Sequence, residues 1–169
     1  TNEAMQDLGK QTKAIDKQVE GLIGQSNATV PRAYTERHLV AEINKLKNAD
    51  VVETEAARMA EELAKYRAAR PENMPAWMAH QAKVANYEAT GNRPYMQNPD
   101  AATAMADKIR MALARGQREA AVSAVPKTAP ALKEQSELLN VMKVAGPRLM
   151  QQGNRDPLGI GVAAPSPGM

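Results

Sequence analysis

The chain has few residues that could do chemistry, because it contains two histidines, His38 and His80, and no cysteine. His38 and Glu42 stand four residues apart, which places both on one face of a helix and would offer two ligands to a metal ion. The sequence has no His-Glu-x-x-His or Glu-x-x-His pairing to supply the remaining ligands. We therefore expect both histidines to be surface or partly packed side chains and predict no metal site.

Hydroxyl groups and carboxylates lack the arrangement that catalysis requires. Ser26, Ser123 and Ser136 lie outside any Gly-x-Ser-x-Gly turn of the kind that exposes a nucleophile. Carboxylates such as Glu61 precede a lysine by four residues, here Lys65, which is the spacing of ion pairs on an exposed helix. The lack of cysteine excludes thiolate catalysis and disulfides. We predict no catalytic or cofactor-binding residue and expect that the chain is not an enzyme.

The composition favours helices with a thin core. The 169 residues include no Phe, one Trp, four Tyr and ten Met, and alanine is abundant. Alanine is the best intrinsic helix former, but it buries little apolar area per residue. Two alternatives follow: the missing burial comes from another copy or a larger partner, or the chain is a modestly stable monomeric bundle.

The charge pattern gives only weak evidence for nucleic-acid binding. The net charge is +3 and is spread evenly along the chain. The nearest approach to a basic patch is Lys108, Arg115 and Arg118, which share one side of a helix. We interpret them as a solvated face. No apolar run reaches the roughly 18 residues that a membrane span needs, so we expect no membrane span.

Residues 2–24 predict a helix with a heptad seam. Its apolar side chains recur at alternating steps of three and four residues, with Thr12 as the polar break. The apolar positions are Met5, Leu8, Ile15, Val19 and Leu22. Such a seam can join copies in a coiled coil or can be one helix of an intrachain bundle, and the pattern leaves both open. We predict that these five residues form an assembly interface.

Five further helices are expected, so the fold class is all-α. Their ranges are 35–48, 51–70, 75–91, 99–125 and 129–152. Thr35 suits an N-cap, Asp50 and Glu53 have the spacing of a capping box, and Asn98 opens a cap-proline-acid start signal. Short loops marked by Pro and Gly connect the helices. Whether they form a compact bundle or an elongated arrangement is left open, because heptad faces look alike in both.

Several interior positions carry further expectations. The side chains that mark the fourth helix are Trp77, Met78, Gln81, Val84 and Tyr87. Gly116 in mid-helix should cost roughly 1 kcal/mol against alanine, unless it lets a neighbouring helix approach closely. Pro147 should kink or break the last helix. No stretch alternates apolar and polar residues for long, so no strand is expected.

We divide the chain into an N-terminal heptad helix (1–25), a helical domain (26–152) and a Gly/Pro-rich C-terminal tail (153–169). Residues 153–169 include four glycines and three prolines, and little polarity is present there that could cap a helix. Residues 157–169 should form an extended tail that docks on a partner or stays mobile. The docking residues that we predict are Pro157, Leu158 and Ile160.

The order and spacing of several pieces resemble an all-helical segment of very large bacteriophage proteins, both virion-internal (ejection) proteins and polyvalent proteins. The resemblance covers residues 28–160. The matching pieces are Val30-Pro31, residues 51–70, Lys83 with Tyr87, Ala114-Arg115-Gly116, Val125-Pro126 and Asn154 to Gly159. Two departures are a Met-rich helix in the 140s where such proteins have a Leu-rich one, and a sequence that stops soon after the turn. The pattern marks folding positions, so no residue role is carried over.

The resemblance implies a bacteriophage virion structural protein of the internal or ejection type. Such a protein would self-assemble through helices and assist genome delivery, and it would reside in the virion after synthesis in the host cytoplasm. Its partners would be further copies, other virion proteins and packaged DNA, contacted without sequence specificity. An alternative is a helical adaptor or decoration protein that binds capsid, portal or tail through its C-terminal tail. A third is a non-catalytic part of a polyvalent protein.

Overall fold

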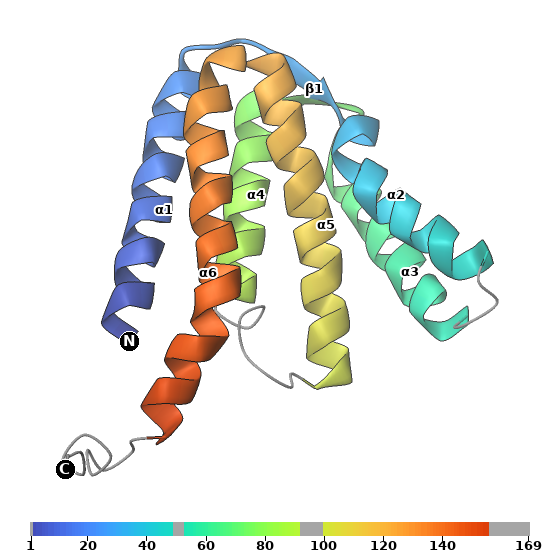
Figure 1. The fold of residues 1–169 in the computed structure, drawn as a ribbon. Coiled ribbons are helices and arrows are strands. Elements are labelled where there is room, and N and C mark those ends of the chain that lie inside the picture. The colour runs from blue at the N-terminus through green and yellow to red at the C-terminus, as the bar shows by residue number, and fades with distance from the viewer. Residues whose placement is uncertain (1, 49–52, 92–99, 156–169) are drawn as a thin grey trace, which may run out of the picture.

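Six α-helices form most of the structure, which confirms the predicted all-α fold class (Figure 1). The computed structural model describes residues 2–48, 53–91 and 100–155, with side chains described as far as residue 145. The helices are α1 (Asn2–Gly24), α2 (Arg32–Asn48), α3 (Glu53–Ala69), α4 (Ala76–Thr90), α5 (Ala101–Ala124) and α6 (Ala129–Arg155). A short 3-10 turn at Pro126–Thr128 joins α5 to α6.

Four helices make a bundle and two form a hairpin beside it. Figure 1 shows α1, α6, α4 and α5 side by side, with the α2–α3 hairpin on the other side of α5. The bundle core contains apolar side chains from α1, α4, α5 and α6, and a second core lies between the hairpin and α5. Because α5 contacts both α4 and α2, it is the helix that connects the two cores.

A two-stranded sheet that the sequence did not predict closes one end of the bundle. Strand β1 (Thr29–Pro31) pairs antiparallel with β2 (Asn73–Pro75), and buried Val30 lies opposite buried Met74. Each strand ends in a proline and leads directly into a helix. The expectation of no strand was wrong, because three residues are too few to show an alternating pattern.

The ends of the two strands are tied by reciprocal backbone hydrogen bonds. The Arg32 N–H donates to the Glu72 carbonyl over 2.7 Å, and the Ala76 N–H donates to the Ala28 carbonyl over 2.9 Å. These N–H groups belong to the first residues of α2 and α4, which have no acceptor within their own helices. The sheet therefore fixes the starting points of α2 and α4 beside each other.

The heptad seam of α1 is buried within the chain. Ile15 and Val19 lie in the bundle core, and Met5 packs against Met142 of α6. Leu8 is partly buried against the same pair, and Leu22 is half-buried. Of the two alternatives for the seam, the structure contains the intrachain bundle, so the predicted assembly residues are covered by α4 and α6. For the same reason α1 is packed into the helical domain and does not stand apart from it.

The inner face of α4 is formed largely by alanine and two basic side chains. Trp77 is 47 % exposed and Gln81 is exposed, whereas Ala79, His80 and Lys83 are buried. The bulky and amphipathic side chains that mark α4 in the sequence therefore do not all lie on the face that packs against the other helices. In the structure, alanine lets α4 approach its neighbours closely, and the two buried basic side chains find hydrogen-bond partners on α1 and α6.

Some helix ends also differ from the sequence signals. Helix α2 begins at Arg32, so Thr35 is not an N-cap; it lies in the first turn, and its hydroxyl donates to the Arg32 carbonyl over 2.7 Å. Asp100 caps α5 by accepting from the Thr103 N–H at 2.8 Å. The predicted caps at Asp50 and Asn98 lie outside the described residues. Helix α6 is not broken at Pro147 and continues to Arg155.

Gly116 lies where α5 meets the first turn of α2. A Cβ atom at this position would fall on the Thr35 carbonyl oxygen and 2.7 Å from the Thr35 carbonyl carbon. The obstacle is backbone, which cannot rotate away as a side chain can. Gly116 therefore serves the close helix approach that was one of its two possible roles.

Candidate functional site

Lys83 lies at the centre of a buried polar cluster that joins α1, α4 and α6. Its side chain is only 1 % exposed. The Nζ atom donates to Asp16 Oδ1 over 2.9 Å and to Gln135 Oε1 over 2.7 Å. Gln135 Nε2 in turn donates to Asp16 Oδ1 over 2.8 Å and to the Thr12 carbonyl over 2.9 Å. One lysine and one glutamine thus connect three helices that are far apart in the sequence.

The environment of Lys83 is the kind that perturbs a lysine. Burial lowers the pKa of Lys83, and the ion pair with Asp16 offsets only part of this effect. A lysine with a lowered pKa is a candidate for general-base or Schiff-base chemistry when a substrate can reach it. Here the ammonium group is already held by Asp16 and Gln135 and lies 5.6 Å from the centre of the Tyr87 ring. The arrangement therefore favours a structural role.

His80 borders the same cluster in its neutral form. The Nε2–H group donates to the Asp16 backbone carbonyl over 3.1 Å, which fixes the tautomer because a carbonyl can only accept. Burial and the neighbouring Lys83 charge lower the pKa of His80. Nδ1 is buried and has no hydrogen-bond partner among the described residues. His80 therefore resists protonation in the folded state.

We expect the stability of the protein to fall as the pH drops below 6.5, and His80 to be one cause. The folded-state pKa of His80 is lowered from 6.5, so the unfolded chain takes up the proton first as the pH falls. Each such histidine contributes at most about 1.4 kcal/mol per pH unit in this window. His80→Gln should reduce the difference in unfolding free energy between pH 7 and pH 5, measured by urea denaturation. An unchanged difference would contradict the assignment; His38, whose pKa is also lowered, should account for the remainder.

A cleft of about 960 Å³ adjoins the cluster. Its lining combines Asp16, His80 and Gln135 with apolar side chains from α1, α5 and α6, among them Met5, Met111, Leu139 and Met142. Lys83 itself is not part of the lining. Other polar side chains of the lining, such as Lys13, Lys17 and Glu88, are exposed and lie outside the cluster.

A second polar cluster lies on the surface between α2 and α5, around Glu119. His38 Nε2 lies 3.0 and 2.9 Å from the two carboxylate oxygens of Glu119. Arg37 also pairs with Glu119, and Arg115 Nε lies 3.4 Å from it. The predicted partner of His38, Glu42, instead forms ion pairs with lysines. His38 and Glu42 are therefore not arranged as a pair of metal ligands.

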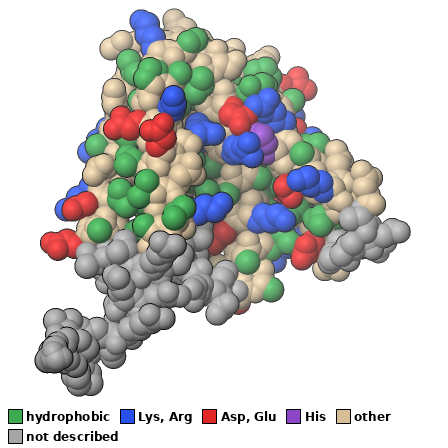
Figure 2. All heavy atoms as spheres, in the orientation of Figure 1, with side chains coloured by type: hydrophobic (Ala, Val, Ile, Leu, Met, Phe, Trp, Pro, Cys, Tyr) green, Lys and Arg blue, Asp and Glu red, His purple; other side chains and the backbone are tan. Residues whose placement is uncertain are grey.

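Lys and Arg side chains gather in the middle of the face shown in Figure 2. On this side of the molecule a hollow of about 420 Å³ lies between α2, α5 and α6. Arg37, Arg118 and Lys133 contribute charges to its lining, and Ser123 and Ser136 contribute hydroxyl groups. The sequence indicated only the part of this surface that lies on α5, because the other basic residues come from different helices.

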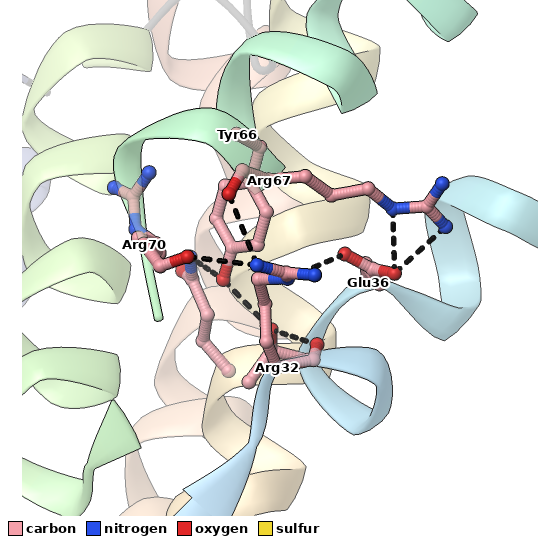
Figure 3. A network of polar contacts seen from close by, with 7 residues as sticks. Arg32, Glu36, Tyr66, Arg67 and Arg70 are labelled. Atoms are coloured by element: carbon pink, nitrogen blue, oxygen red, sulfur yellow. Dashed lines mark hydrogen bonds and ion pairs between the residues drawn. The ribbon is translucent and has the colours of Figure 1, made fainter. Parts of the chain in front are cut away.

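A third polar cluster holds the hairpin together (Figure 3). Arg32 donates to the carbonyls of Arg67 (3.0 Å) and Arg70 (2.8 Å) at the C-terminal end of α3. These carbonyls have no partner within the helix. The buried carboxylate of Glu36 accepts from Arg67 Nε over 2.9 Å, and the Tyr66 hydroxyl lies 2.7 Å from Thr35 Oγ1. This cluster stabilises the start of α2 against the end of α3.

The structure places the remaining predicted site residues as follows. The tail residues Pro157, Leu158 and Ile160 lie outside the described residues. Within the described ranges, no group of three or more His, Cys, Asp or Glu side chains is placed to hold a metal ion. None of the helices within these ranges is long and apolar enough to cross a membrane.

Sequence analysis missed Asp16 and His80 as members of a buried cluster. Signals for the other two members were present, since Gln135 is spaced by three and four residues from the apolar Leu132 and Leu139 and Lys83 is one of the residues that carry the phage resemblance. Asp16 follows the seam residue Ile15 directly, and the apolar spacing gives no signal for it. The spacing of residues along the sequence does not show that the three helices bring these polar groups together.

Comparison with known proteins gives no relative for this chain: no protein-family model, curated protein or solved structure matches it.

Proposed function

We propose that this chain is a structural protein of a bacteriophage particle, of the internal or ejection type, and that it is not an enzyme. The observation that carries the proposal is the Lys83 cluster. The groups best suited to chemistry, Lys83, Asp16 and Gln135, are bonded to one another across three helices. Such a cluster defines how helices align, which is the property that a building block of a larger assembly requires.

The composition of the bundle supports the same proposal. A buried ion pair adds little net stability compared with an apolar core, but it can select one helix arrangement over others. In an alanine-rich bundle many alternative alignments would bury similar apolar area, so this selection matters more than usual. Together with the resemblance to phage proteins, this favours a module that must keep a defined shape among other copies, virion proteins and packaged DNA.

Contacts between copies must use surfaces that remain exposed in the folded chain. Val141 and Val144 are 50 % and 67 % exposed and lie one turn apart on α6. We expect light scattering after gel filtration to show a multimer, or a mass that grows with concentration. Val141→Asp with Val144→Asp should lower that mass without loss of helicity. A compact 18.3 kDa monomer at every concentration would contradict self-assembly.

That monomer result would instead favour the alternative, a helical adaptor or decoration protein that binds capsid, portal or tail through residues 157–169. The burial of the α1 seam within the chain is the observation in its favour. Because the seam is buried, it is not exposed for self-assembly, and the tail is the other contact that the sequence predicts.

A further inference from the structure

The hollow between α2, α5 and α6 is lined by the basic groups of Arg37, Arg118 and Lys133 and by one carboxylate, that of Glu119. Arg118 and Lys133 both line it, and neither forms an ion pair with any residue in the described ranges. Arg37 and Arg115 lie beside them and share one carboxylate, that of Glu119. Within the described residues, Glu119 is thus the carboxylate that forms ion pairs with this group of four, through Arg37 and Arg115.

The ring of His38 lies in the field of three nearby guanidinium groups. The carboxylate of Glu119 lies within hydrogen-bond distance of His38 Nε2, and alone it would raise the pKa of the imidazole. The pKa of His38 is nevertheless lowered, first by burial and then by the charges of Arg115, Arg37 and Arg118. Burial is the largest cause, and the three guanidinium groups act in the same direction.

The chemistry of the lining matches a phosphate backbone. Arginine and lysine form charge-assisted hydrogen bonds to phosphate oxygens. Ser123, Ser136 and Tyr34 lie in the same lining, and their hydroxyl groups are neutral donors. On α5, Lys108 and Arg118 are ten residues apart, about 15 Å at the helical rise. Duplex DNA carries one charge per roughly 1.7 Å of its axis, so a basic surface of this length would span several phosphates, although Lys108 at its end is paired with Glu42.

The same surface fits an acidic protein less well. Protein interfaces depend on a few buried aromatic or aliphatic anchors. The large hydrophobic side chains that are exposed among the described residues are Trp77, Val141 and Val144. None of them belongs to the lining of the hollow. Tyr34, the aromatic residue of the lining, is half-buried beneath Arg37, so the basic surface offers charge and hydroxyl donors and no fully exposed apolar anchor.

We propose that the surface formed by Arg37, Arg115, Arg118 and Lys133 binds the sugar–phosphate backbone of double-stranded DNA without sequence preference, with Arg118 and Lys133 as the principal contacts. This inference assigns the DNA contact of the proposed function to a particular surface. It rests on the proposed function for one point, the choice of DNA among the possible polyanions. Arg118 and Lys133 are available because no carboxylate in the described ranges neutralises them. When DNA binds, Arg37 and Arg115 give up part of their contact with Glu119 and contact phosphate groups instead.

The test is a fluorescence-anisotropy titration of the full chain against labelled 30-base-pair duplexes of two unrelated sequences. With about three phosphates neutralised, the slope of log K against log salt should be roughly −2.7, so affinity should fall about 40-fold between 50 and 200 mM salt. Arg118→Ala with Lys133→Ala should weaken binding to both duplexes equally and reduce the slope by about 2. Lys133→Ala alone, at an exposed position, should reduce it by about 1 and leaves the fold undisturbed.

The matched control is Arg58→Ala with Lys65→Ala, which removes the same charge from exposed positions on α3. It should bind as the wild type does. Equal weakening by the control pair, a salt-independent affinity, or stronger binding of polyglutamate than of DNA would each overturn the proposal. The light-scattering mass separates the two proposals: an assembled protein that does not bind DNA contradicts only this inference, and a monomer that binds DNA contradicts only self-assembly.

Discussion

Gly116→Ala should lower the free energy of unfolding by about 3 kcal/mol, the upper end of the usual range for overpacking. The added methyl group would overlap the carbonyl of Thr35, whose Cα atom is also only 3.3 Å from the new Cβ. Relief requires α2 to move away from α5, and that motion would open the contact of Tyr66 with Gln117 and the second core. Urea denaturation followed by circular dichroism at 222 nm measures the effect.

Two other glycines provide the control. Gly9 and Gly21 lie within α1, and a Cβ atom at either position would have no heavy atom within 4 Å. Since glycine in a helix interior is less favourable than alanine, Gly9→Ala and Gly21→Ala should each stabilise the protein by about 0.5–1 kcal/mol. The same substitution should therefore have opposite signs in α1 and at Gly116. A Gly116→Ala variant as stable as the wild type would show that α2 and α5 are not packed as described.

Lys83→Met should destabilise the protein by about 3–5 kcal/mol, the usual effect of breaking a buried ion pair by removing one partner. Methionine has a similar length, so packing is nearly kept, while Asp16 loses its counter-charge and Gln135 loses the donor to its Oε1. The destabilisation should appear as a lower midpoint in urea with little change in the slope m. A decrease below about 1 kcal/mol would contradict a structural role for the cluster.

The control for Lys83 is an exposed lysine of α1. Lys17→Met changes the net charge by the same amount at a solvated position and should alter stability by no more than about 0.5 kcal/mol. Combining Lys83→Met with Asp16→Leu should recover part of the loss, because replacing both partners by apolar groups leaves no uncompensated charge. If the double variant is no more stable than Lys83→Met, the loss reflects packing and not the broken pair.

The helices could be predicted from sequence, because their apolar spacing and their proline and glycine boundaries are local signals. The α4 C-terminus at Gly91, with its positive φ of 54°, is one such signal. The orientation of α4 could not be predicted, because alanine does not mark an inner face. Large apolar side chains are usually buried, yet Trp77 is exposed, and Lys83 lies inside because partners on α1 and α6 compensate its charge.

The candidate sites were harder to predict than the helices, for one physical reason. Both the Lys83 cluster and the basic surface combine residues from three helices, and only the packed fold brings them together. Arg115 and Arg118 were found because they share α5. Lys133 was not associated with them, because its helix is related to α5 only by tertiary packing. Local spacing thus reports which residues share a helix, but not which helices meet.

The pairing of β1 with β2 has a consequence for how the chain tolerates change in length. The polypeptide leaves the four-helix bundle at Pro31 and returns at Asn73, and these two residues face each other in the sheet. The segment that contains the α2–α3 hairpin therefore begins and ends at neighbouring positions. Residues added or removed at its far end would not alter the distance between Pro31 and Asn73. The packing of the bundle should therefore tolerate insertions and deletions in the hairpin better than in its own helices.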